Sequence, residues 1–325
     1  MRMNRRKTLA VLAGAAAAPA SLRAQAWPNR RITIIVPYGP GGYIDVAARI
    51  VADGLRERTG QQAIVLNRPG GNGQVGLGEL ARAAPDGYTL LMNNDGGICV
   101  QAAFDRNFRF EPGKDFTPLA QIVASNYVLT VRNDLPPKTI AEFIAFAKQA
   151  RPSLTFGSPG QGTTPHIGME FLARRVGADL LHVPYPGITG SLNDLMNGRL
   201  DLQMSSVSNI KSFVEAGKLR VLAAMSSTRV ADFPEIPTLA EGGVPGFNVS
   251  AWLGLFGPPG MDEPTRASVS KVFADTVRDP RLGEKLRGMS VDPVTMEAAE
   301  FAAFYLRELR GWRAFADESG IKVGD

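Results

Sequence analysis

The chain has 325 residues, of which 36 are basic and 31 acidic, for a net charge of +5. Five of the basic residues and none of the acidic ones fall in the first 26 positions, so the rest of the chain carries no net charge. Nucleic-acid binding therefore loses its main support. A single cysteine, Cys99, excludes an intrachain disulfide, and the two histidines, His166 and His182, are too few and too far apart in sequence to predict a Cys/His metal site.

Residues 1–26 have the pattern of a signal peptide. A basic start at residues 2–7 precedes an apolar run at 9–18, and Ala24-Gln25-Ala26 supplies the small residues of a cleavage site. The apolar run is shorter than the roughly 20 residues that a membrane-spanning helix needs. We therefore expect a periplasmic protein cleaved after Ala26, with an uncleaved anchor or a disordered tail as the alternative. The Arg5-Arg6 pair leaves open whether export follows the general or the twin-arginine route.

Beyond residue 26, the hydrophobic pattern alternates between strands and helices. Asp45 is predicted to cap the first helix and Gly60 to end it. A second helix is predicted at 74–84, and Thr139 and Glu142 form a capping box before a third at 140–150. The chain from Pro264 onward is predicted to be mostly helical, ending in an amphipathic stretch at 297–318. Short apolar runs typical of buried strands occur at 32–36, 63–66, 88–92, 154–157, 180–184, 200–204, 219–225 and 251–256.

This alternation predicts an α/β protein with doubly wound, mainly parallel sheets flanked by helices. No segment rich in Pro, Gly or Ser separates two consecutive domains. Two lobes would therefore be joined by strands that cross between them, near 125–129 and 248–251. We expect one lobe from residues 27–127 plus 250–325 and the other from residues 128–249.

Three predicted strands run into glycine-rich turns that open helices. These turns are residues 37–42, 157–164 and 184–191. Each leaves backbone N–H groups without partners at the positive end of a helix, which is an anion site. None of the three contains arginine, so dipoles and hydroxyls would hold an anion without a formal countercharge. The alternative is that the glycines simply make the turns.

At this point the chain resembles a known family, the tripartite tricarboxylate transporter receptors, also called Bug-type solute-binding proteins. The resemblance covers the whole chain, and the set of motifs is more specific than any one of them. The matching segments are Trp27-Pro28, Ile32–Val36, Pro40-Gly41-Gly42, Asp45, Ala48-Arg49, Asn67-Arg68-Pro69-Gly70, Ala84-Pro85-Asp86-Gly87-Tyr88-Thr89-Leu90, Lys114-Asp115-Phe116, Gly157-Ser158, Gly160, Gly162, His166, His182-Val183-Pro184-Tyr185, Gly187, Ala216-Gly217-Lys218-Leu219-Arg220, Pro234 and Pro237-Thr238.

The resemblance implies a periplasmic receptor with two hinged α/β lobes, similar to a type II periplasmic binding protein, and a ligand cleft between them. It implies no cofactor and no metal, a small carboxylate ligand, and the membrane components of a tripartite tricarboxylate transporter as partners. We expect a monomer. Carried over by position, the residues that would meet the ligand are Gly41 and Gly42, then Ser158, Gly162, Thr163 and Thr164, then Tyr185 and Gly187, with Asn93 and Asn94 on the same cleft. The candidate set also includes Tyr38, Pro40, His166 and Ser206, and Asp45 is expected to be a structural cap beside the site.

Two departures from the family pattern bear on the ligand. Tyr43 stands where members usually have a small residue. Hydroxyls at Ser205 and Ser206 stand where members often have an acidic residue, which can pair with the ammonium group of an amino acid. The resemblance therefore favours a plain carboxylate, aliphatic or aromatic, over an amino acid.

Other readings of the sequence were weighed against a receptor. A hydrolase could use Ser158 with His166, but Gly157-Ser158-Pro159 is no nucleophile elbow, and His166 near a helix start is more often a cap or packing residue. A dinucleotide site could use the G-x-G-x-x-G pattern at 71–76 with Asp95, although a periplasmic compartment has no obvious nicotinamide supply. A receptor that serves a sensor kinase in place of a transporter remains open.

Overall fold

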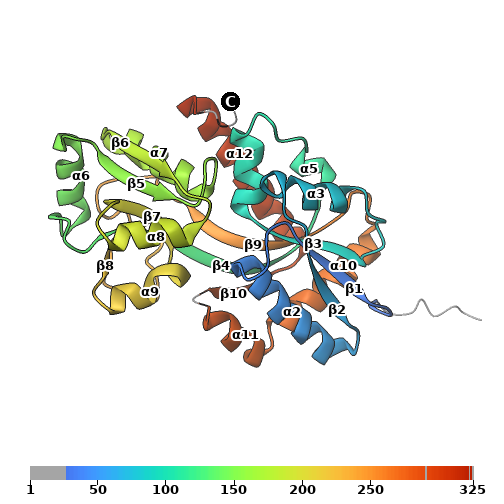
Figure 1. Cartoon of the computed structure of the whole chain (residues 1–325). Helices are drawn as coiled ribbons and strands as arrows, with labels where there is room; N and C mark the ends of the chain where they lie inside the picture. The colour runs from blue at the N-terminus through green and yellow to red at the C-terminus, as the bar shows by residue number, and fades with distance from the viewer. Residues whose placement is uncertain (1–26, 290, 322, 324–325) are drawn as a thin grey trace, which may run out of the picture.

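Figure 1 shows two groups of strands, each flanked by helices, that are joined through β4 and β9. This computed structural model describes residues 27–289, 291–321 and 323. The predicted signal peptide and its cleavage site lie outside the described residues. Among the helices in the described ranges, none has the length and apolar character needed to cross a bilayer.

The first strand group has the order β2-β1-β3-β9-β4, with β10 also paired to β4. β1 runs parallel to β2 and β3, as expected for buried, mostly aliphatic strands joined through helices. β9, β4 and β10 are antiparallel to their neighbours, so the sheet is mixed. The strands are β1 (Ile32–Val36), β2 (Ala63–Asn67), β3 (Thr89–Asn94), β4 (Thr117–Arg132), β9 (Ser250–Gly257) and β10 (Asp292–Met296).

The second strand group has a parallel part in which β5 lies between β6 and β7. β4 continues into this group and pairs antiparallel with β7 and β8. The change of partners along β4 falls between Asn126 and Tyr127, inside the crossing predicted at 125–129. The division of the chain into 27–127 plus 250–325 and 128–249 stays a prediction. The additional strands are β5 (Leu154–Ser158), β6 (Leu180–Pro184), β7 (Leu202–Ser206) and β8 (Leu219–Ala224).

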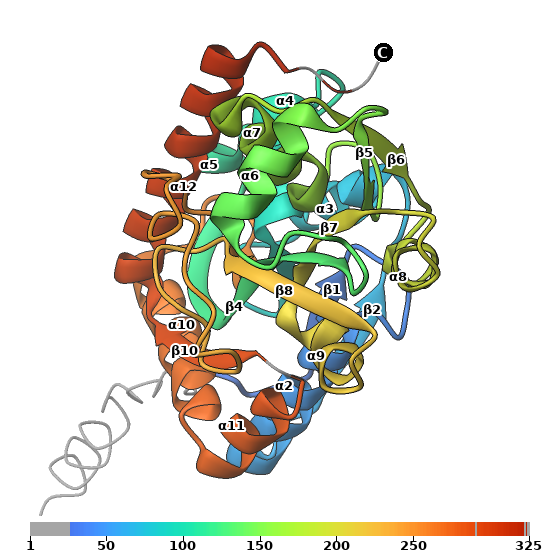
Figure 2. The same ribbon diagram turned by 90° about the vertical axis from the view of Figure 1, so that its left-hand side faces the viewer.

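Helices cover both groups and follow the parallel strands. Gly60 ends α2 in a left-handed conformation, as predicted. In Figures 1 and 2, α12 runs along one flank of the molecule from near β10 to near α7. The helices are α2 (Tyr43–Thr59), α3 (Gln74–Ala81), α4 (Gln101–Phe104), α5 (Pro112–Asp115), α6 (Ile140–Gln149), α7 (Thr164–Val176), α8 (Ile188–Met196), α9 (Val207–Glu215), α10 (Glu263–Val277), α11 (Pro280–Arg287) and α12 (Ala298–Ser319), with short helical turns η2 (Gly71–Gly73) and η3 (Gly96–Val100).

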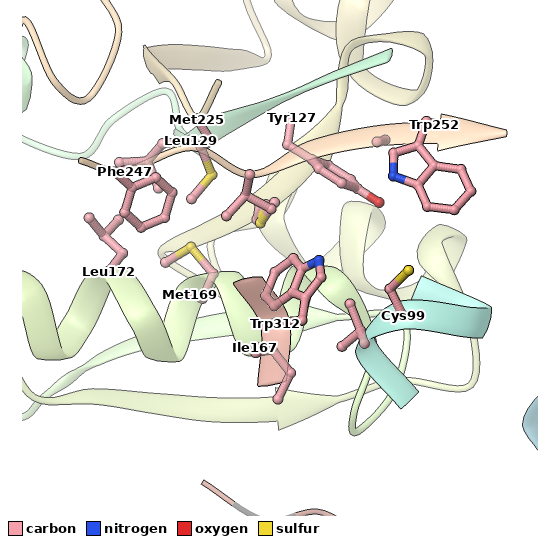
Figure 3. Close-up of a cluster of buried hydrophobic side chains, with 14 of the residues drawn as sticks. Cys99, Tyr127, Leu129, Ile167, Met169, Leu172, Met225, Phe247, Trp252 and Trp312 are labelled. Atoms are coloured by element: carbon pink, nitrogen blue, oxygen red, sulfur yellow. The ribbon is translucent and has the colours of Figure 1, made fainter. Parts of the chain in front are cut away.

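The largest buried cluster joins the two strand groups. Figure 3 shows Met169 of α7, Trp252 of β9 and Trp312 of α12 within it. Phe315 of α12 packs on Phe171 of α7 with ring centroids 4.2 Å apart. α12 therefore holds α7 in contact with the first strand group. Burial of these large rings stabilises the contact between the two strand groups.

Three elements differ from the sequence prediction. β4 has 16 residues, but only its middle was recognised as a crossing strand. Its register shifts, near Pro118 and again before Val123, interrupt the alternation by which a strand is recognised. β10 was missed because Pro293 and a register shift break its short pattern. At α6, Thr139 accepts the Glu142 N–H as predicted (3.2 Å), but the Glu142 carboxylate accepts from Lys138 instead of completing the box.

Candidate functional site

A cavity of about 420 Å³ lies between the two strand groups. Eight of the predicted ligand-binding residues line it: Tyr38, Gly42, Asn94, Gly162, Thr163, Thr164, Gly187 and Ser206. Six do not: Pro40, Gly41, Asn93, Ser158, His166 and Tyr185. The sequence thus located the cavity but not every side chain on its wall.

Four helices begin at this cavity, and their N-cap residues all line it. The N-caps are Gly42 for α2, Thr163 for α7, Gly187 for α8 and Ser206 for α9. None of these four described residues caps its helix with a side-chain hydrogen bond. The first N–H groups of a helix have no intrahelical partner and carry the positive end of its dipole. The cavity therefore collects four positive helix ends.

The two hydroxyl N-caps are engaged elsewhere. Thr163 Oγ1 donates to the Gly160 carbonyl at 2.7 Å, inside its own loop. Ser206 Oγ lies 3.0 Å from Ser208 Oγ and accepts from Asn209 Nδ2 at 2.8 Å. Because Ser206, Ser208 and Asn209 all line the cavity, this network presents polar groups on its wall.

α2 and α7 begin in the same way, and this corrects the prediction for Asp45. Gly42, not Asp45, is the N-cap of α2, and Asp45 stands three residues inside the helix. Its carboxylate reaches back to accept the Gly41 N–H at 2.9 Å. In α7, Nδ1 of His166 accepts the Gly162 N–H at 3.0 Å from the equivalent position. The N–H groups of Gly41 and Gly162 are thus already bonded within their loops, although both residues were predicted to meet the ligand.

Asp45 is buried and held by several donors. It accepts from Arg49 Nε (3.0 Å) and Asn67 Nδ2 (3.0 Å) in addition to Gly41. Burial opposes ionisation of Asp45, but the hydrogen bonds from Arg49, Gly41 and Asn67 outweigh it and hold the pKa of this carboxyl below its usual value. An ionised Asp45 therefore fixes the loop before α2.

Ser158 does not form the pair with His166 that the hydrolase alternative would need. Its hydroxyl is fully buried and lies 2.7 Å from Nε2 of His182. The His166 and His182 rings stack with centroids 3.9 Å apart. Burial lowers the pKa of both histidines to about 4, and His182 adds to the effect on His166. Two neutral rings thus pack beneath the glycine-rich turn at residues 157–164, and the Ser158 hydroxyl does not line the cavity.

Two more of the predicted residues outside the cavity, Tyr185 and Asn93, have structural partners. The Tyr185 hydroxyl donates to Asp194 at 2.7 Å. Oδ1 of the fully buried Asn93 accepts the Asn94 N–H at 2.9 Å. These side chains shape the glycine-rich turn at residues 184–191 and the end of β3 without lining the cavity.

Sequence reasoning missed part of the wall. Gln101, whose Nε2 donates to the Asn72 carbonyl at 2.6 Å, and Tyr127 on the largely unpredicted β4 both line the cavity. Tyr127 falls inside the predicted crossing at 125–129, so that crossing was a usable signal. With Tyr38 and Tyr43 it gives the cavity three aromatic rings. Among the described residues on the wall, Asp45 is the one with a charged side chain, and Lys, Arg and His are absent.

Comparison with known proteins identifies the family. A model of the tripartite tricarboxylate transporter family receptor matches residues 47–321. The chain belongs to this receptor family. The match confirms the resemblance in the sequence.

Solved structures give the same fold. The periplasmic binding protein BugD is 28% identical, with a TM-score of 0.79 over 91% of this chain and 99% of BugD. An R. palustris protein solved with adipate is 30% identical, with a TM-score of 0.81 over 91% and 99%. MatC from Rhodopseudomonas palustris, with bound malate, is 27% identical, with a TM-score of 0.77 over 89% and 99%. The receptor has the two-lobed α/β fold of periplasmic binding proteins.

Proposed function

We propose that this receptor captures a small carboxylate in the cavity between its strand groups. The observation that carries the proposal is the convergence of four helix N-termini whose N-cap side chains accept no backbone N–H of their own helices. Such helix ends bind anions through backbone N–H groups and the helix dipole. Gly42, Thr163, Gly187 and Ser206 mark the positions where these donors would meet a carboxylate.

Among the described residues, the cavity wall has no cationic side chain, which suits a receptor that must release what it binds. A ligand held by a buried arginine would gain a charge-assisted, bidentate contact. Here the donors are backbone N–H groups, hydroxyls and amides, including those of Asn94, Ser206 and Asn209. We expect a dissociation constant in the micromolar range or below, about −8 kcal/mol or tighter.

The other residues that line the cavity suggest the chemical character of the ligand beyond its carboxylate group. Tyr38, Tyr43 and Tyr127 lie with Ile44, Ile188 and Met204 around the cavity, whose volume is in the ordinary range for small-molecule sites. Adipate and malate bind to structural neighbours of this chain. We propose an aliphatic or aromatic carboxylate with one or two acid groups, bound without turnover and passed to the membrane components of a transporter after export to the periplasm.

A panel of carboxylates tests this proposal. The chain without residues 1–26 would be screened by thermal shift against aliphatic and aromatic mono- and dicarboxylates, with amino acids and uncharged amides of the same shape as controls. Ligand at 100 times its Kd should add about 2.7 kcal/mol to the free energy of unfolding. Stabilisation by the amides but by none of the acids would contradict an anion site.

The same panel separates binding from catalysis. Ligand recovered after long incubation should be chemically unchanged, because Ser158, His166 and His182 do not line the cavity. Hydrolysis of an ester or amide that disappears in both Ser158→Ala and His182→Gln would favour the hydrolase reading instead.

A further inference from the structure

Asp95 is a fully buried carboxyl next to the cavity. It follows β3, between Asn94 and Gly96, which both line the cavity. Its Oδ1 has no hydrogen-bond partner among the described residues. A buried carboxyl with an unpartnered oxygen is costly unless it serves the structure or the function.

The other oxygen of Asp95 connects the two strand groups. Oδ2 accepts a hydrogen bond from Thr164 Oγ1 at 2.6 Å. Thr164 is the first residue of α7, is 1% exposed, and lines the cavity. This contact thus holds the start of α7 against the end of β3, across the cavity.

The groups that face Asp95 come from every element packed around it. Tyr38 precedes α2, Tyr43 lies on α2 and Tyr127 on β4, and each interacts electrostatically with its carboxyl. Cys99 of η3 does the same, and the carboxyl of Glu308 on α12 also acts on it. Burial raises the pKa of Asp95 to about 7, and Glu308 adds to the increase; the hydrogen bond from Thr164 opposes it, as do the dipoles of the nearby backbone N–H groups of Trp252 and Gly96.

We propose that Asp95 is the positioning residue for closure of the cavity, and that its neutral form holds Thr164 and α7 against β3 whereas its ionised form favours their separation. The direction follows from burial. Closing removes Asp95 Oδ2 from water, which disfavours the charged carboxyl, and opening lets water solvate it. A carboxylate ligand acts in the same direction, because two like charges at neighbouring positions repel.

The proposal couples closure of the cavity to the uptake of a proton. Its predicted effect on binding rests on the proposed carboxylate site. Closing takes up a proton when Asp95 would be ionised in the open form. Affinity for an anionic ligand should therefore fall as the pH rises from the ordinary carboxyl value of 3.8 to about 7 and level off above it, with about a tenfold part of that fall between about pH 6 and about pH 8.

Small-angle X-ray scattering of the ligand-free protein tests whether Asp95 controls closure of the cavity. The wild type should have a larger radius of gyration at about pH 8 than at about pH 6. Asp95→Asn keeps an oxygen that can accept from Thr164 and cannot ionise, so it should stay compact at both. Thr164→Val removes the donor and should be expanded at both, and Thr164→Ser should restore the wild-type response.

Thr276→Val is the matched control. Thr276 is also buried, and its hydroxyl donates to the Val272 carbonyl at 2.7 Å inside α10, away from the cavity. It should scatter like the wild type at both pH values. Identical scattering of wild type, Asp95→Asn and Thr164→Val at both pH values would overturn the proposal.

Calorimetric titration with adipate adds the binding arm. The wild type should bind about tenfold more weakly at about pH 8 than at about pH 6, while Asp95→Asn binds equally at both. A pH dependence that persists unchanged in Asp95→Asn would also overturn the proposal. If adipate bound to no variant, adipate would be excluded as the ligand. The scattering would still decide whether Asp95 controls closure of the cavity.

Discussion

The four helices that begin at the cavity differ from α6, α10, α11 and α12, which begin away from it. α6, α10 and α11 have N-caps Thr139, Asp262 and Asp279, each of which accepts a backbone N–H of its own first turn. At α12, Ser270 accepts the Ala298 N–H at 2.7 Å. α2, α7, α8 and α9 have no such cap. α3 and α5 also lack a side-chain cap, but their N-caps, Gly73 and Glu111, do not line the cavity. Uncapped helix starts that also line the cavity are therefore where the fold can offer donors to a ligand.

The largest expected effect comes from filling the cavity end of α2. Gly42 has a φ of −71°, and a Cβ placed there would meet nothing nearer than the Gly39 carbonyl at 3.7 Å. Gly42→Val should therefore fold without backbone strain, yet occupy the space before the α2 N–H groups. We expect its Kd for a carboxylate to rise at least about a hundredfold, measured by calorimetric titration.

Gly311→Val is the control for that substitution. Gly311 is exposed on α12, and nothing lies within 4 Å of an added Cβ. This variant should bind like the wild type. Unimpaired binding by Gly42→Val would show that the start of α2 only makes a turn, and the anion site would then have to be sought at α7, α8 and α9.

A smaller effect is expected for Asp45, whose side chain fixes the loop before α2 but which is not the N-cap of that helix. Asp45→Ala removes the bonds to Gly41, Arg49 and Asn67, which should lower the free energy of unfolding by about 1–3 kcal/mol. Because the pKa of Asp45 is lowered in the folded protein, its stabilisation is present above the ordinary value of 3.8 and is lost as the pH falls through the folded value. Binding should weaken about tenfold as the loop loosens. Urea unfolding and titration measure both; full stability with lost binding would assign Asp45 directly to the ligand.

The surface helices should respond in stability alone. Asp262→Ala removes the bond to the Thr265 N–H (2.8 Å) and should cost about 0.5–2 kcal/mol of unfolding free energy, by chemical denaturation. Its Kd should equal that of the wild type. A change in affinity here would break the distinction between the two sets of helix starts.

The smallest net effect is expected in the pH dependence of stability. His166 and His182 have pKa values lowered to about 4, so their contribution is full above the ordinary value of 6.5 and is lost as the pH falls toward 4. Asp95, with its pKa raised to about 7, acts oppositely and lowers stability as the pH rises from 3.8 to 7. The two contributions partly cancel. Urea unfolding of Asp95→Asn should therefore show a steeper rise of stability over this range than the wild type, and parallel curves would contradict the assignment.

The sequence predicted the parallel strands and the helix starts because their signals are local. β1 and β6 occupy the ranges expected from their apolar runs. The glycine turns indicated three of the four cavity helices, since a turn before a helix is visible in consecutive residues. Ser206 at the start of α9 was reached through the family resemblance instead.

The parts that were missed depend on contacts between distant segments. Asp45 was assigned as an N-cap from its residue type, but its bonds to Arg49 and Asn67 place it inside α2. The hydrolase alternative considered His166, eight positions away, as the partner of Ser158, whereas the sheet brings His182 to it through the register of β5 and β6. Tyr127 was missed as a wall residue because β4 has irregular pairing.

The position of β9 has a consequence for how the chain reaches its native state. β9 lies between β3 and β4, although more than a hundred residues separate its sequence from theirs. β5, β6, β7 and β8, in contrast, all come from one stretch between Leu154 and Ala224. Local contacts form sooner than distant ones, because closing a long loop costs more entropy. We therefore expect the second strand group to acquire structure while the first still lacks a central strand, and the inserted β9 to be the last strand to join its sheet.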